Sequence, residues 1–143
     1  LSECQMVHKI NLQVESDLAA ADRVLSWFQQ LNQPSMPDQK TWFQCLTLLQ
    51  EGFINIAEHS HKDLPTETPI DIEAVRLDDR IEIRIWSLGP PFNLKQQLSE
   101  IPELENNYDE RHRGLKIIEA WADEFNYEKT DDSRHCLFIM KRY

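Results

Sequence analysis

The sequence predicts an α+β fold, a two-layer α/β sandwich in which helices cover one face of a mixed, mostly antiparallel sheet. Apolar residues alternate with polar ones in stretches 6–14 and 81–86, which is the spacing of half-buried strands. In 17–31 and 38–59 they recur every three or four residues, which indicates helices with one buried face. The order of strand, helix, helix, two strands, polar stretch, helix and two strands favours helices packed on one face of an antiparallel sheet.

The first half of the chain reads as one strand followed by two helices. The strand covers 6–14, and Ser16 is the predicted N-cap of a helix over 17–31, because its hydroxyl can accept from a free backbone N–H. A loop containing two prolines follows this helix. The second helix covers 38–59, and Trp42 belongs to its apolar stripe.

The second half reads as two hairpins separated by a polar stretch and a helix. Residues 93–112 lack periodicity, and a long stretch of this kind within a compact domain is typical of a lid or binding loop, or of disorder. The predicted strands are 70–77 and 81–86 before this stretch, and 125–128 and 134–141 after a helix over 115–125.

The length and charge of the chain exclude several classes of protein. With 143 residues it is expected to form a single domain, 1–143. Its net charge of −10 and pI of about 4.9 disfavour direct binding to nucleic acid or to an anionic membrane. Widely spaced cysteines without a CxxC motif indicate a reducing, cytoplasmic setting. Because the chain begins at Leu1 rather than at a methionine, a domain cut from a larger signalling protein is one expectation.

Glu51, Asn55 and His59 are spaced by four residues within the second predicted helix. Four residues is slightly more than one turn, so the three side chains stack along one face, roughly opposite the apolar stripe. A carboxylate beside an amide oxygen suits a hydrated Mg²⁺ bound to phosphates, and the carboxylate could instead act as a general base. The alternative is the solvated face of an ordinary amphipathic helix, which the spacing alone favours.

Two glycines mark positions where a ligand could bind: a turn that it could approach closely and the start of a helix. Gly89, followed by two prolines, fixes a stiff turn at the end of a predicted strand. Gly114 begins a predicted helix, where free N–H groups and the positive end of the dipole favour a phosphate. Arg111 and Arg113 add local positive charge. The alternatives are an ordinary strand exit and basic residues at the end of a loop.

Taken in this order, these features resemble the anti-sigma factor serine/threonine kinases of the GHKL group of ATPases, whose domain is also called HATPase_c. Glu51, Asn55 and His59 match the N-box of that family. Residues 85–93 stand where the G1 box belongs, and residues 112–115 stand where the G2 box belongs. The resemblance covers nearly the whole chain, and it implies the Bergerat-type ATP-binding fold.

The resemblance also implies the chemistry of the site. Asn55 would hold the Mg²⁺ that bridges the phosphates of ATP, and the catalytic Glu51 would orient or deprotonate the attacking hydroxyl. The stretch 93–112 would be the ATP lid. The residues implied to contact the nucleotide are Asn55, His59, Ser87, Gly89, Phe92, Arg113, Gly114 and Leu115.

The function implied by the resemblance is regulation of transcription by a cytoplasmic protein kinase. Such a kinase uses ATP and Mg²⁺ to phosphorylate an anti-anti-sigma partner of the STAS type on a serine. It also binds a sigma factor, and homodimers are common in the family.

Ser87 and His112 depart from the family pattern. Ser87 stands where the G1 box normally carries an aspartate that accepts a hydrogen bond from the adenine amino group. A hydroxyl accepts without charge, which predicts on the order of tenfold weaker ATP binding. His112 stands where the G2 box usually carries a glycine. A weak kinase therefore remains open beside a degenerate GHKL domain, with weak or no ATP turnover, that acts as a partner-binding regulatory module. Trp86, on the polar phase of its strand, is the expected partner contact.

Overall fold

The computed structural model describes residues 5–89 and 110–143, except for the side chains of residues 110–113. The sheet has the strand order β1-β2-β3-β5-β4, and each of these neighbouring pairs is antiparallel. The strands are β1 (Met6–Glu15), β2 (Pro69–Leu77), β3 (Arg80–Ser87), β4 (Glu124–Lys129) and β5 (His135–Arg142). The α-helices are α1 (Ala21–Phe28), α2 (Gln39–Asn55) and α4 (Glu110–Trp121).

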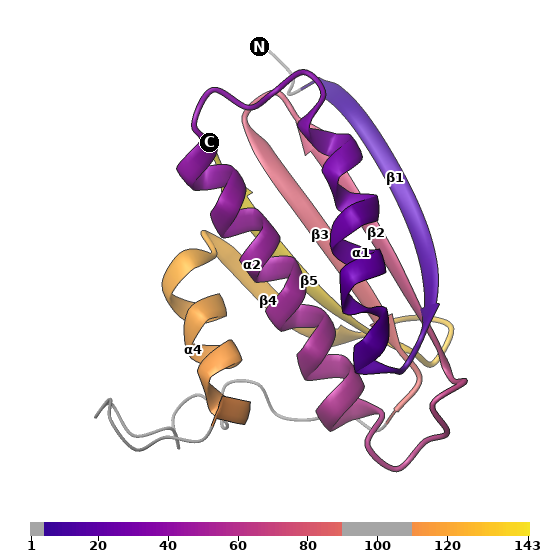
Figure 1. The fold of residues 1–143 in the computed structure, drawn as a ribbon. Helices are drawn as coiled ribbons and strands as arrows, with labels where there is room; N and C mark the ends of the chain where they lie inside the picture. The colour runs from indigo at the N-terminus through magenta and orange to yellow at the C-terminus, as the bar shows by residue number, and fades with distance from the viewer. Residues whose placement is uncertain (1–4, 90–109) are drawn as a thin grey trace.

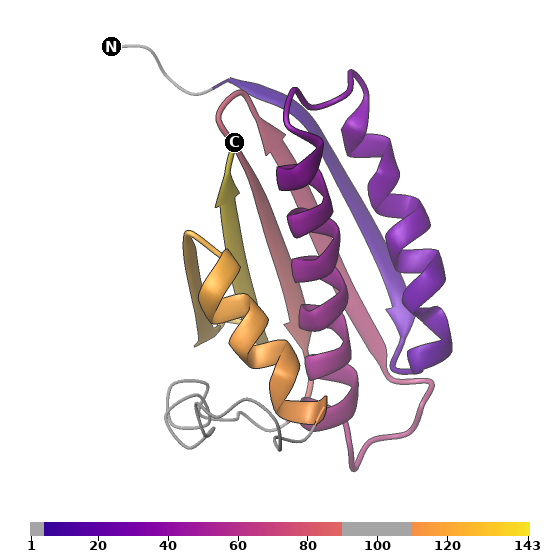
Figure 2. The ribbon, with the colours of Figure 1, turned by 60° about the vertical axis from the view of Figure 1, so that its left-hand side comes forward.

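The helices form one layer and the sheet forms the other (Figure 1). In both ribbon views α2 runs between α1 and α4 along one face of the sheet (Figure 2). The core lies between the layers, with Phe28 and Phe53 from the helices and Ile83 and Ile139 from the strands each at most 2% exposed. The predicted α+β sandwich is therefore confirmed, although the sheet of the described residues is antiparallel rather than mixed.

The helical segment that follows β1 begins differently from the prediction. A 3₁₀ turn, Leu18–Ala20, precedes α1, and a second one, Gln29–Asn32, follows it. The cap is Asp17, whose carboxylate accepts from the Ala19 N–H at 2.9 Å, so the prediction of Ser16 as N-cap is wrong. The hydroxyl of Ser16 contacts residues of a distant loop instead.

The second helix begins next to its predicted start, and its last predicted residues take a different geometry. The Asp38 carboxylate accepts from the Lys40 N–H at 3.0 Å and from the Thr41 hydroxyl at 2.8 Å. After Asn55 the backbone continues as a π-helical turn, Ile56–Ser60. Such turns insert an extra residue into the helical repeat and are frequent at functional sites.

Helix α4 begins earlier and ends earlier than the sequence indicated. It spans Glu110–Trp121, so Gly114 lies inside it and the prediction that Gly114 opens the helix is wrong. Glutamate and arginine favour helical backbone, which explains the additional turn before the glycine. Phe125 pairs with Ile139 in the sheet and so belongs to β4 rather than to the helix. The predicted lid, 93–112, lies outside the described residues except for its last three, which begin α4.

None of the described helices is long and apolar enough to cross a membrane.

Candidate functional site

The three predicted motifs meet at one end of the molecule, where α2 and β3 end and α4 begins (Figure 1). A Cβ added to Gly114 would collide with a carboxylate oxygen of Glu51. A Cβ added to Gly89 would collide with the backbone carbonyl of Ser60. Neither glycine has a positive φ, so both are required by close approach rather than by an unusual backbone conformation. These contacts join the second and third motifs to the segment that carries the first.

Asn55 is buried, with 3% of its surface exposed. Its Oδ1 atom has no hydrogen-bond partner among the described residues. The alternative of a solvated polar face does not hold for this residue, because its side chain is buried. A buried amide oxygen without a partner costs about 1–3 kcal/mol, which a cation or a donor at this position would offset.

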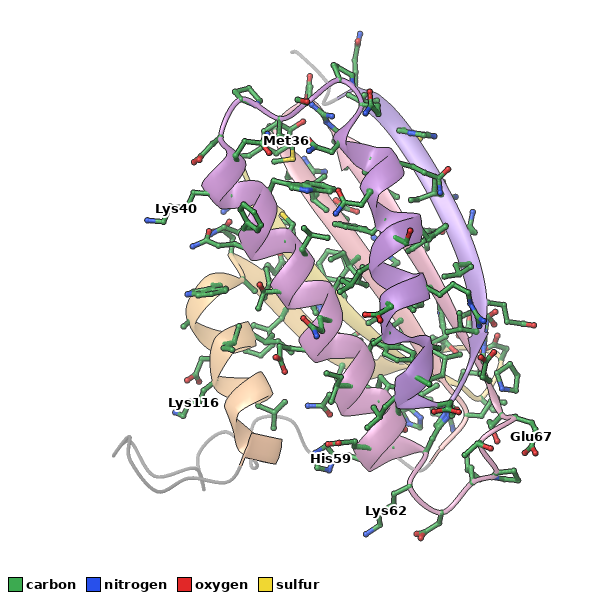
Figure 3. The ribbon with its side chains drawn as sticks, in the orientation of Figure 1. Met36, Lys40, His59, Lys62, Glu67 and Lys116 are labelled. Atoms are coloured by element: carbon green, nitrogen blue, oxygen red, sulfur yellow. The ribbon has the colours of Figure 1, made fainter. Side chains whose placement is uncertain are left out.

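Glu51 lies four residues before Asn55 in the sequence and His59 four residues after it, and both are only half-buried. Glu51 faces the second turn of α4 through its contact with Gly114. His59 lies in the π-helical turn at the lower end of α2 (Figure 3). Because that turn departs from α-helical spacing, the predicted stacking of the three side chains holds for the first two and is altered at His59.

Ser87 ends β3 and is fully buried. Its hydroxyl lies 3.2 Å from the hydroxyl of Tyr127, which comes from β4, and the Tyr127 ring stacks on His135 at 5.5 Å between centroids. Each hydroxyl can donate and accept, so this pair is a neutral site without a preferred charge. Tyr127 was not predicted, since only the pairing of β4 with β5 and of β5 with β3 brings it to Ser87.

His61 is a second residue that the sequence analysis did not assign. It is 2% exposed, and its Nε2 atom accepts from the Leu88 N–H at 2.9 Å. Its Nδ1 atom lies 2.5 Å from the Ser16 hydroxyl oxygen. Burial lowers the pKa of His61 below its usual value of 6.5, because the charged imidazolium loses its hydration. The turn after β3 is therefore tied to the end of the π-helical turn.

The remaining predicted residues are placed as follows. Leu115 is 1% exposed and belongs to the hydrophobic core, so its side chain contributes to packing. Arg113 lies in α4, and its side chain is outside the described part of the structure. Phe92 lies outside the described residues altogether.

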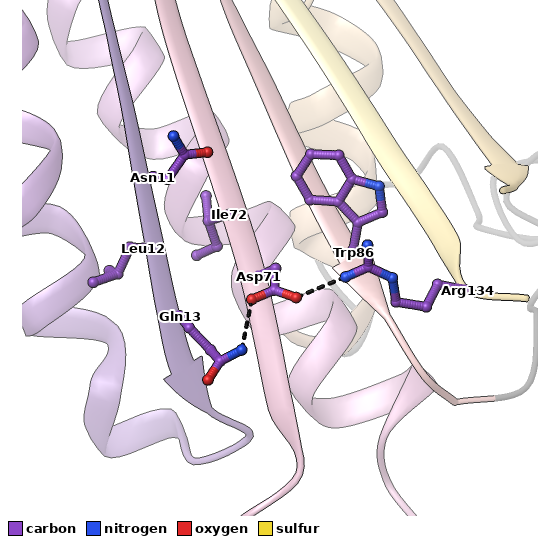
Figure 4. Close-up of a pocket in the computed structure, with 7 residues that line it drawn as sticks. All are labelled: Asn11, Leu12, Gln13, Asp71, Ile72, Trp86 and Arg134. Carbon is purple, nitrogen blue, oxygen red and sulfur yellow. Dashed lines mark hydrogen bonds and ion pairs between the residues drawn. The ribbon is translucent and has the colours of Figure 1, made fainter. Parts of the chain in front are cut away.

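Trp86 lies on the face of the sheet opposite the helices, away from this site. It is half-buried and borders a cleft of ≈ 310 Å³ that β1, β2 and β3 line (Figure 4). The Arg134 guanidinium lies 5.5 Å from the centre of the Trp86 ring and donates to Asp71 at 2.6 Å. Gln13 also donates to Asp71, at 2.9 Å. Asp71 thus binds both Gln13 and Arg134 within this cleft.

The cysteines that the structure describes are poor nucleophiles. Burial raises the pKa of the Cys45 thiol to about 12 and that of Cys136 to about 11. Both thiols therefore stay protonated near neutral pH, and the thiolate is the reactive form of cysteine.

Comparisons with known proteins agree with this geometry. Residues 14–141 match the family described as the histidine kinase-like ATPase domain. No curated protein matches the chain. A chain from the crystal structure of the SiaB–SiaC complex from Pseudomonas aeruginosa has a similar fold, with a TM-score of 0.61 and 12% sequence identity. The match covers 97% of this chain and 91% of that chain. At this identity the likeness concerns the fold alone.

Proposed function

Since the chain belongs to the histidine kinase-like ATPase domain family, we propose that it is an ATP- and Mg²⁺-dependent protein kinase. Its substrate would be a serine or threonine of an anti-anti-sigma partner of the STAS type. The observation that carries the proposal is the buried, unpartnered Oδ1 of Asn55, one helical turn from Glu51.

The residues present fit a magnesium ion. Mg²⁺ takes oxygen ligands and retains several waters, so one or two protein groups are enough to hold it. Asn55 offers an oxygen that the described part of the protein leaves unused. When bound, Mg²⁺ would neutralise charge on the nucleotide phosphates during transfer. Asn55 would hold the ion, one helical turn from Glu51.

Glu51 would act on the incoming hydroxyl. Its carboxylate is half-buried and faces Gly114, where the absence of a Cβ leaves room for it. From this position it would orient the hydroxyl of the substrate serine or threonine, or accept its proton. Phosphoryl transfer needs little covalent chemistry from a protein, so the contribution of these residues is position and electrostatics.

The adenine end of the site supports a second candidate function. Ser87 and Tyr127 provide two neutral hydroxyls where a carboxylate would discriminate adenine more strongly. Weak nucleotide binding favours a degenerate domain of this family, with little or no ATP turnover, that regulates by binding partners. Such a domain could stand alone or within a longer signalling protein.

A protein partner is part of either candidate. The similar chain of known structure comes from a complex of two proteins, which supports a partner-dependent role for this one. The sheet face that carries Trp86 has no described helix over it, so it is the surface we assign to a partner. Binding of a sigma factor, homodimer formation and a cytoplasmic location complete the proposal.

The experiment is a transfer assay with Mg²⁺ and γ-labelled ATP, using the purified anti-anti-sigma partner as substrate. We expect transfer by the wild type, and at least about 100-fold slower transfer by Glu51→Gln with nucleotide affinity retained. Glu119→Gln is the matched control, because Glu119 is an exposed glutamate of α4 that pairs with Lys116. Nucleotide binding without transfer by the wild type would favour the degenerate domain. Equal transfer by wild type and Glu51→Gln would overturn the assigned role of Glu51.

A further inference from the structure

His61 joins three segments that are distant in the sequence. It follows the π-helical turn, receives the Leu88 N–H on Nε2, and contacts the Ser16 hydroxyl through Nδ1. That hydroxyl lies in turn 2.6 Å from the Thr68 carbonyl oxygen. With His61 2% exposed and Ser16 8% exposed, water does not compete effectively for these bonds.

The partners determine the protonation state of the imidazole. The Leu88 N–H can only donate, so Nε2 must accept and carries no proton. The Thr68 carbonyl can only accept, so the Ser16 hydroxyl donates to it. The Ser16 oxygen is then the acceptor for a proton on Nδ1. This chain is satisfied by the neutral imidazole protonated on Nδ1, whereas an imidazolium would direct an Nε2 proton at the Leu88 N–H.

The bond to Leu88 acts on the turn that contains Gly89. Gly89 packs against the backbone carbonyl of Ser60, the residue before His61. Ser60 and His61 therefore support the turn that follows β3, the strand that ends at Ser87.

We propose that His61 is a positioning residue of the nucleotide site, which in its neutral form holds the Leu88–Gly89 turn in the geometry that binds ATP. The inference rests on the proposed function, since it takes this turn to be part of a nucleotide site. His61 acts through the turn and contacts no reacting atom.

Charged groups around His61 do not control its state. Burial is the one cause of its lowered pKa. At the end of β1, Glu15 pairs with Arg23 and Asp17 caps the following 3₁₀ turn. On β2, Asp71 pairs with Arg134. The charged or titratable residues of the neighbouring turn and loop are the half-buried Glu58 and His59 and the exposed Lys62, Asp63 and Glu67. The protonation state of His61 would therefore follow the pH of the solution. As the pH falls below the usual histidine range, the imidazole would gain a proton, lose its bond to the Leu88 N–H and release the turn.

The test compares His61→Gln with His61→Leu. The Gln side chain offers an oxygen to the Leu88 N–H and does not titrate, whereas Leu leaves this N–H without a partner. We expect calorimetry to show that His61→Leu binds Mg–ATP about tenfold more weakly than wild type at about pH 8, and that His61→Gln restores binding. At about pH 5 we expect wild type to fall below His61→Gln. The ratio of these two affinities cancels protonation of the nucleotide itself.

Hydrogen exchange of the Leu88 amide gives a readout that needs no nucleotide. We expect protection in wild type and His61→Gln at about pH 8 and its loss in His61→Leu. His8→Gln and His8→Leu are matched controls, because His8 pairs with Arg76 at the other end of β1 and should change neither readout.

Each result decides one of the two claims. Protected Leu88 in wild type and His61→Gln, together with no Mg–ATP binding by any variant, would refute the nucleotide site while the role of His61 in holding the turn stands. Wild-type affinity and Leu88 protection in His61→Leu would overturn the positioning role, as would a ¹⁵N spectrum showing the His61 proton on Nε2.

Discussion

Replacing Gly114 by alanine should separate the stability of the protein from its chemistry. A Cβ at this position would collide with a carboxylate oxygen of Glu51. The Glu51 Cδ and Cβ atoms would lie 3.4 and 3.5 Å from it, which is ordinary contact distance. Only the tip of the glutamate must therefore move, and the helix backbone can stay in place.

The energy terms of this substitution nearly cancel. Alanine inside a helix is favoured over glycine by about 1 kcal/mol, and Gly114 lies inside α4. Forcing Glu51 off its rotamer costs about 0.5–1.5 kcal/mol. The free energy of unfolding should then change by less than about 1 kcal/mol. Displacing a catalytic group by about 1 Å can reduce the rate about 100-fold, so phosphoryl transfer should fall by about that factor.

Denaturant unfolding and the rate of phosphate transfer from saturating Mg–ATP measure the two effects. Gly52→Ala is the matched control, because Gly52 is a helical glycine whose added Cβ would lie 3.0 Å from Ile85 Cδ1 and 3.2 Å from Ile139 Cδ1. That change overpacks the core and should lower stability by about 1–3 kcal/mol with a smaller effect on the rate. A fully active Gly114→Ala protein of unchanged stability would refute the reasoning that places Glu51 beside Gly114 for catalysis.

Further predictions concern the turn after β3 and its supports. Ser87→Asp should bind ATP about tenfold more tightly in calorimetry, because a charged acceptor forms the stronger hydrogen bond. Without ligand it should melt at a lower temperature, because a buried carboxylate beside Tyr127 loses hydration. Unchanged affinity would remove the argument for a degenerate adenine site. Gly89→Ala should lower the free energy of unfolding by about 1–3 kcal/mol, since the clash is with the Ser60 backbone and no side chain can relieve it; a loss under about 0.5 kcal/mol would contradict this contact. Because the pKa of His61 in the folded protein is below 6.5, the unfolded state binds more protons as the pH falls from about 6.5. The free energy of unfolding should therefore decline over this pH range. A decline that is absent from wild type, or equally large in His61→Gln, would contradict a neutral His61 in the folded state.

The regular elements could be predicted because local pattern determines them. The alternation of Ile81, Ile83 and Ile85 marks β3, and all three residues are at most 2% exposed. The helix over α2 follows from its apolar stripe, and the structure shows Asp38 as its cap.

The departures arise where contacts between distant residues override local pattern. Ser16 has the sequence features of a cap, but its hydroxyl serves His61, which is 45 residues away. Asn55 reads as solvated from its helix alone, but the fold buries it. The π-helical turn after Asn55 is too short to show a residue spacing that would distinguish it from the α-helix before it.

The candidate site was partly predictable for the same reason. Spacing placed Glu51 and Asn55 on one face of the second helix, and the two prolines after Gly89 indicated a tight turn there. The structure brings Gly114 beside Glu51, although Gly114 lies within α4 rather than at its start. Tyr127 could not be predicted as a site residue, because only the pairing of the strands brings its hydroxyl to Ser87.

The central claim is that Asn55 holds Mg²⁺ for a nucleotide bound at this end of the fold. Calorimetric titration of wild type and Asn55→Ala with ATP, each with and without Mg²⁺, tests it most directly. We predict saturable binding by the wild type that Mg²⁺ strengthens, and loss of this strengthening in Asn55→Ala with the protein still folded. Absence of binding by the wild type, or equal Mg²⁺ dependence in Asn55→Ala, would contradict the account.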